Sequence, residues 1–189
     1  MQVDNHSSVP QRGLAGSIRR MVGTLCSALI AASVLTLGST GAHAQAPSAT
    51  AAKPKALIVL SAASQWTRAD GKKYDSGVWA EEFIVMEEKL TQAGFQVDLA
   101  TPGGVAPTID KLSLTPRMAG GEAIAEHFRQ YLATHAARLA KPLVLKTVDE
   151  RGYDAVIIPG GHGPVEDLYK DADMGRILLA ANRSSKIIA

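Results

Sequence analysis

Four short apolar runs, separated by longer segments with helical spacing, constrain the fold of this chain most strongly. The runs are Ala56–Leu60, Phe95–Ala100, Asp154–Pro159 and Lys186–Ala189. The first of them, Ala56–Leu60, is continuously apolar, which is typical of a strand buried on both faces of a parallel sheet. Helical spacing lies between them, at about residues 78–93, 121–139 and 165–182. The β-α-β-α-β-α-β order predicts a doubly wound α/β fold: a three-layer αβα sandwich around a mostly parallel sheet with right-handed crossovers.

The first 44 residues have the pattern of a secretory signal. Arg19 and Arg20 precede the apolar run Met21–Leu37, and a small-x-small site, Ala-His-Ala, ends at Ala44. We expect cleavage after Ala44, a periplasmic or secreted location and no stable membrane association afterwards. The alternative is an uncleaved anchor, because the 17 residues of the run just reach the lower limit for a membrane span. Residues 45–55 then read as an Ala/Pro/Ser-rich linker, and residues 56–189 as the α/β domain.

Charge and cysteine content exclude several functions for the domain. Residues 45–189 contain 17 Lys+Arg and 17 Asp+Glu, so they carry no basic footprint for a nucleic acid. The only cysteine, Cys26, lies in the leader, so the mature chain would have neither a disulfide nor a thiol nucleophile. His127 and His135 are about two helical turns apart, too far to share a metal. We expect no metal and no organic cofactor.

The segment Gly77–Phe83 opens the first helix and contains two adjacent glutamates. On a helix, Glu82 shares a face with Trp79 and Met86, so its side chain should point inward while Glu81 is solvated. An acid on an apolar face is costly unless it is paired or neutral, and such groups suit proton transfer. The alternative is that both glutamates only favour the helix dipole. The same helix should bury Phe83, Met86 and Leu90 and expose Glu87, Glu88 and Lys89.

A glycine-rich turn, Pro159–Pro164, follows the third strand and precedes a helix. Glycines in such a turn expose backbone N–H groups, which can hold an oxyanion or a phosphate. Gly160, Gly161 and His162 are therefore candidates for substrate binding. The alternative is an ordinary loop, because Gly/Pro punctuation after a strand is common. The turn is not a P-loop, since no Gly-Lys-Ser/Thr follows it. Trp66 and Tyr74 could line a pocket or only pack.

Together these segments resemble the DJ-one/PfpI superfamily, which belongs to the class I glutamine amidotransferase-like proteins. The resemblance is carried by Gly77, Glu81–Glu82, Ala93–Phe95, Thr101–Gly104 and Tyr153–Pro164. Within the superfamily they are most similar to the heat-shock-chaperone branch that includes glutathione-independent glyoxalase III. The resemblance implies a flavodoxin-like fold, a homodimer, a small aldehyde substrate and no cofactor.

The resemblance also implies roles for individual residues. Glu82 matches the family's buried glutamate, which contacts a reactive cysteine on a nucleophile elbow. Gly161 matches the glycine whose N–H helps to form the oxyanion pocket, whereas His162 belongs to the branch signature but is not the family's catalytic histidine. In glyoxalase III the thiolate attacks methylglyoxal, the glutamate moves a proton between the two carbons, and hydrolysis gives D-lactate.

The sequence departs from this family at the cysteine elbow, which is expected on the strand that Lys186–Ala189 opens. On that basis we expect the chain as written to be a C-terminally truncated and inactive member with an incomplete sheet. Two alternatives come from other functional classes. One is a holding chaperone of the stress response, and the other is a protein that binds a small ligand without catalysis.

Overall fold

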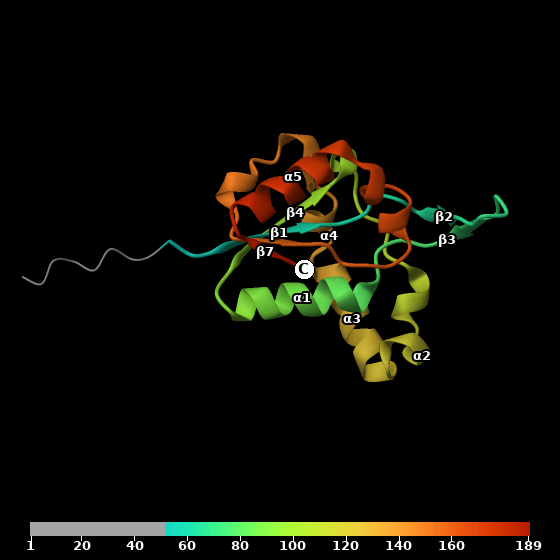
Figure 1. Cartoon of the computed structure of the whole chain (residues 1–189). Helices are drawn as coiled ribbons and strands as arrows, with labels where there is room; N and C mark the ends of the chain where they lie inside the picture. The colour runs from blue at the N-terminus through green and yellow to red at the C-terminus, as the bar shows by residue number, and fades with distance from the viewer. Residues whose placement is uncertain (1–51) are drawn as a thin grey trace, which may run out of the picture. The chain divides into compact units, whose positions relative to one another are not determined.

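A computed structural model describes residues 52–189 (Figure 1). Its main sheet has five strands in the order β5-β4-β1-β6-β7, and every neighbouring pair is parallel. The strands are β1 (Lys55–Val59), β4 (Gln96–Thr101), β5 (Leu143–Val144), β6 (Ala155–Ile157) and β7 (Ile187–Ile188). The four predicted runs thus correspond to β1, β4, β6 and β7, and the α/β flavodoxin-like fold class is confirmed. The two-residue edge strand β5 was not predicted.

Helices cover both faces of this sheet (Figure 1). One face packs against α1 (Ala80–Gln92) and α3 (Glu122–Thr134), through side chains that include Phe83 and Phe128. The other face packs against α5 (Ala172–Arg183). The strand β1 alternates between the two cores, with Ile58 facing α1 and Val59 facing the opposite layer. Full burial of each large apolar side chain stabilises the fold by about 1.5–3 kcal/mol.

Helix α1 has one end fixed from a distant segment and the other by a local motif. Its N-cap residue, Trp79, makes no side-chain cap, and Ser113 Oγ accepts a 3.0 Å hydrogen bond from the Ala80 N–H instead. At the other end Gly94 has φ of +87°, and the Phe95 N–H donates to the Leu90 carbonyl oxygen at 3.0 Å. Gly94 ends the helix in this left-handed conformation, in which other residues are strained.

The two later helices are shorter than predicted. The segment 121–139 divides into α3 and a separate turn of helix, α4 (Ala136–Leu139), with α2 (Pro116–Ala119) before them. The helix predicted from about residue 165 begins only at Ala172, where Asp171 accepts a hydrogen bond from the Met174 N–H. Pro164 and the turns before Asp171 interrupt the helical spacing. Short 3-10 turns span Pro102–Gly104, Lys111–Leu114, Leu145–Thr147, Glu150–Gly152, Gly163–Val165 and Leu168–Lys170.

A small antiparallel hairpin, β2 (Gln65–Thr67) and β3 (Lys73–Asp75), extends away from the main sheet (Figure 1). It was not predicted, because its short strands are largely polar and exposed. Glu166 attaches it to the body by accepting hydrogen bonds from the Thr67 N–H and hydroxyl, at 3.0 and 3.1 Å. The hairpin therefore has a fixed contact with the segment that follows the glycine-rich turn.

The predicted signal peptide, its cleavage site and most of the linker lie outside the described residues, so they stay predictions. Within residues 52–189, none of the helices combines the length and the apolar character needed to cross a membrane.

Candidate functional site at the sheet switch point

The direction of the chain across the sheet reverses between β1 and β6. From β1 the chain passes through α1 to β4 on one side, whereas β6 lies on the other side of β1 and continues through α5 to β7. In open α/β sheets, ligands bind outside the carboxyl ends of the strands at such a switch point. The glycine-rich turn Pro159–Pro164 directly follows β6 at this place. The sequence-predicted candidates thus lie where the fold class expects a ligand.

Backbone segments approach one another closely at this point. Val78 forms isolated bridges with Ile109 on one side and Gly161 on the other, and the Trp79 N–H donates to the Gly160 carbonyl oxygen at 3.0 Å. Gly161 has φ of +106°, and a Cβ there would overlap the Gly77 carbonyl oxygen. Only glycine fits both conditions, so the turn is built around Gly161 for steric reasons.

Glu82 is held against this turn from the first helical turn of α1. Its Oε2 accepts a 2.6 Å hydrogen bond from the Gly160 N–H, and a Cβ on Gly160 would come within 2.5 Å of the same oxygen. The prediction that Glu82 points into the apolar interior is wrong, since the residue is exposed. Because Glu82 lies in the first turn of the helix, its carboxylate lies over the loop and not over the sheet. The Gly160 N–H of that loop is its hydrogen-bond donor. Glu81 is exposed, as expected.

The Gly161 N–H remains available for another acceptor. Within residues 52–189, no group accepts a hydrogen bond from it. A backbone N–H fixed beside an exposed carboxylate is an arrangement that can bind a carbonyl oxygen and move a proton on the same molecule.

His162 lies over a neighbouring polar cluster. Its ring stacks on Trp66 with centroids 4.5 Å apart and an angle of 16° between the planes. Its Nδ1 lies 3.4 Å from Ser76 Oγ, which in turn lies 2.9 Å from Asp110 Oδ2. Trp66 thus contacts a candidate residue, whereas sequence reasoning had left pocket lining and packing open for it. Ser76 and Asp110 were not predicted, because isolated polar residues in loops give no local signal.

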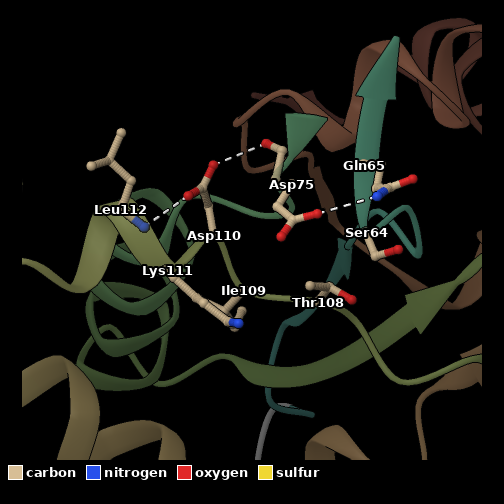
Figure 2. A pocket seen from close by; sticks show the side chains of 9 residues that line it. Ser64, Gln65, Asp75, Thr108, Ile109, Asp110, Lys111 and Leu112 are labelled. Atoms are coloured by element: carbon tan, nitrogen blue, oxygen red, sulfur yellow. Dashed lines mark hydrogen bonds between the residues drawn. The ribbon is translucent and has the colours of Figure 1, made fainter. Parts of the chain in front are cut away.

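A cavity of about 330 Å³ adjoins this cluster (Figure 2). Most of its lining residues are polar, and they come from the hairpin and from the loop before α2. In Figure 2, Asp110 is hydrogen-bonded to the Leu112 N–H, and Asp75 to the Gln65 side-chain amide. The lining comprises Ser64, Gln65, Asp75, Ser76, Thr108, Ile109, Asp110, Lys111 and Leu112. Neither Glu82 nor Gly161 belongs to this lining. His162 is connected to the cavity by its hydrogen bond with Ser76, which lines it.

The loop after β1 is fixed by a single carboxylate. Asp167 accepts hydrogen bonds from Ser61 Oγ at 2.9 Å and from the Ala62 N–H at 2.8 Å. Ser61 is fully buried, and a Cβ on Gly163 would overlap its hydroxyl oxygen. The carboxyl ends of β1 and β6 are therefore bound together below the site.

Comparison with known proteins adds sequence similarity to this geometry. No protein-family model matches the chain. The protein/nucleic acid deglycase HchA of Pseudomonas aeruginosa, from two strains, is 30% identical over 113 residues, which cover 59% of this chain and 38% of the relative. This similarity supports the resemblance of the motifs to the DJ-one/PfpI superfamily. HchA is the kind of relative that the resemblance to the glyoxalase III branch implied.

Solved structures agree on the fold of this chain. Glyoxalase III from Candida albicans has a TM-score of 0.59 and 22% identity, covering 71% of this chain and 55% of that one. A rapid encystment protein from Francisella tularensis also has a TM-score of 0.59, with 20% identity, covering 71% and 56%. The chain thus spans little more than half the length of these structures and less than half of HchA.

A second acidic residue on α1 contrasts with Glu82. Glu87 is only 3% exposed, so its predicted place on the solvent face is wrong. Its carboxylate pairs with Arg138 and accepts a 2.5 Å hydrogen bond from the Tyr131 hydroxyl. Arg138 also donates to the Val97 carbonyl oxygen at 2.7 Å. Burial, together with nearby Glu88, raises the pKa of Tyr131 to about 12. Each charged group of this cluster has a partner within the protein, as expected for a structural ion pair.

The two helix histidines of the chain do not meet at a common ligand site. His127 Nε2 lies 3.0 Å from Glu88 Oε1, and His135 stacks on Tyr131. Among the residues that the structure describes, no group of three or more His, Cys, Asp or Glu side chains is placed to hold a metal ion.

Proposed function

We propose that residues 52–189 form the carbonyl-binding part of a glyoxalase- or deglycase-type active site. The observation that carries the proposal is the pairing of the Glu82 carboxylate with the Gly160 N–H, at 2.6 Å, beside the unused Gly161 N–H at the switch point. The names of HchA and glyoxalase III support this class of activity. The substrates would be 2-oxoaldehydes such as methylglyoxal, or the adducts that these aldehydes form with amines.

The Gly161 N–H and the Glu82 carboxylate have separate roles in the proposed reaction. The Gly161 N–H donates to the substrate carbonyl oxygen, where negative charge develops as the carbonyl carbon is attacked. Glu82 takes the proton from the aldehyde carbon of the thiol adduct and returns it to the neighbouring carbon, so the aldehyde carbon is oxidised as the ketone carbon is reduced. Water then hydrolyses the resulting thioester to D-lactate and regenerates the thiol. No external oxidant or reductant is needed.

The thiol in this scheme is not supplied by the described part of the chain. Residues 52–189 contain no cysteine. The proposal therefore assigns to these residues the binding of the carbonyl group and the proton transfer, and it assigns the nucleophile to a cysteine outside them.

The test uses the protein expressed from its own gene, incubated with methylglyoxal without glutathione, with D-lactate as the readout. Glu82→Gln keeps the size of the side chain but removes the base, so the rate should fall by about 10²–10⁴-fold. Glu81→Gln is the matched control, because Glu81 is also exposed but the hydrogen bond from the Gly160 N–H goes to Glu82. It should retain the full rate.

Two outcomes would contradict the proposal. Equal rates for the wild type and Glu82→Gln would remove Glu82 from the reaction. The absence of turnover by the wild type, both on methylglyoxal and on its adducts with amines, would instead favour the alternatives of a chaperone or a binding protein. A rate on the adducts but not on the free aldehyde would select the deglycase form.

A further inference from the structure

Three side chains form a hydrogen-bonded chain that ends at the candidate site. Asp110 Oδ2 lies 2.9 Å from Ser76 Oγ, and Ser76 Oγ lies 3.4 Å from His162 Nδ1. Asp110 is 7% exposed and Ser76 is 4% exposed, while His162 is exposed. The buried residues Asp110 and Ser76 therefore hold the exposed His162, which directly follows Gly161 in the sequence.

The number of protons in this chain determines the state of the imidazole. A carboxylate only accepts hydrogen bonds, and Asp110 already accepts one from the Leu112 N–H at 2.9 Å. Ser76 has a single hydroxyl proton, and its hydroxyl donates a hydrogen bond to Asp110. Ser76 Oγ can then only accept from His162, so the proton of the neutral imidazole belongs on Nδ1. This leaves Nε2 as the nitrogen with a lone pair.

The ring is also held in its plane. Trp66 stacks on it at 4.5 Å, and the hairpin that carries Trp66 is attached through Thr67 to Glu166. Within residues 52–189, Nε2 of His162 has no hydrogen-bond partner. His162 directly follows Gly161, and its imidazole is oriented with a free acceptor nitrogen. It is therefore suited to contact a molecule that is bound by the Gly161 N–H.

We propose that His162 contacts the substrate at the Gly161 turn, with Nε2 accepting a hydrogen bond from a hydroxyl group next to the bound carbonyl. Ser76 and Asp110 are positioning residues that fix the Nδ1–H tautomer. The inference rests on the proposed function and narrows the species held at the turn to carbonyl compounds with a neighbouring hydroxyl. The thiol adduct of methylglyoxal has such a hydroxyl next to its ketone, and so do the adducts of methylglyoxal with amines.

Two substitutions at His162 separate this role from a structural one. His162→Asn keeps a donor near the position of Nδ1, toward Ser76, but leaves nothing at the position of Nε2. His162→Gln places an amide near the position of Nε2 and gives up the contact with Ser76. We expect His162→Asn to raise KM about tenfold with little change in kcat, and His162→Gln to stay closer to the wild type. The reverse order would mean that the contact with Ser76 only supports the fold, which would overturn the proposal.

A second measurement needs no turnover. Nitrogen NMR of the chain labelled at histidine, with His162→Asn to assign the signal, should report the Nδ1–H tautomer, and Ser76→Ala should remove that preference. Hydroxyacetone, which has a hydroxyl next to a carbonyl, should then shift the Nε2 signal of the wild type. The inference would be overturned by an Nε2–H tautomer. It would also be overturned if the Nε2 signal did not change while the Gly161 amide signal shifted, and the proposed function would then still hold. If neither signal moves, both proposals fail.

Discussion

The first and second turns of α1 carry two glutamates that the fold treats in opposite ways. Glu82 is exposed and its carboxylate rests on a backbone N–H of a loop. Glu87 is buried and pairs with Arg138 while it accepts from Tyr131. Sequence reasoning expected the reverse, with Glu82 inside and Glu87 outside.

This difference teaches that helical periodicity alone is a poor guide to the burial of an acidic side chain. The buried carboxylate of Glu87 has charged and hydrogen-bonding partners within the protein, Arg138 and Tyr131. The exposed one has a single backbone partner, which orients it and leaves its second oxygen accessible. The predictions below test the two glutamate environments separately.

The largest expected effect is on stability, at the buried pair. Arg138→Leu leaves Glu87 buried without its cation, and we expect the free energy of unfolding to fall by about 3 kcal/mol, the lower end for a broken buried pair because Arg138 is only half-buried. Urea unfolding followed by circular dichroism measures this loss. The double variant Glu87→Leu/Arg138→Leu should recover most of it, since no charge remains unpaired. Full stability of Arg138→Leu alone would show that the pair contributes little.

A smaller effect is expected at the glycine-rich turn. Gly94→Ala and Gly161→Ala both place a Cβ at positive φ, but only at Gly161 would that atom overlap the backbone of another segment. We expect about 1 kcal/mol of lost stability for Gly94→Ala and about 2 kcal/mol for Gly161→Ala. Only Gly161→Ala should also weaken binding of a carbonyl ligand. Equal losses in the two variants would mean that the turn tolerates a side chain.

The smallest effect is a change of stability with pH. The pKa of Tyr131, raised to about 12 in the fold by burial, is near 10 in the unfolded chain. The folded state therefore holds this proton more tightly, and the stabilisation is present below pH 10 and is lost as the pH rises toward 12. Thermal unfolding across this range should show a steeper fall for the wild type than for Tyr131→Phe. Identical slopes would exclude a contribution from Tyr131.

Much of the fold followed from local pattern, because buried parallel strands need continuous apolar residues. The run Ala56–Leu60 was sufficient to place the central strand, and the helical spacing over residues 78–93 was sufficient to place α1. The hairpin β2–β3 and the short strand β5 give no comparable signal, because their residues are mostly polar or exposed.

The candidate site was also predicted only in part, because only some of its residues form a local pattern in the sequence. The glycines of the turn and Glu82 were recognisable because they form a motif along the chain. The partners that decide geometry lie far away in sequence. Arg138 is 51 residues from Glu87, and Asp110 is 34 residues from Ser76. Helical periodicity alone assigned Glu87 to solvent, since it cannot register a cation that the fold brings from another helix.

The central claim is that a carbonyl ligand binds at the Glu82 turn and not at the Glu87 pair. Backbone amide shifts of the labelled chain during a titration with hydroxyacetone test it most directly. We predict the largest shifts at Gly160, Gly161 and His162, with Glu82→Gln weakening them and Glu81→Gln leaving them unchanged. Shifts centred on Glu87, Tyr131 and Arg138, or no shifts at the turn, would contradict the account.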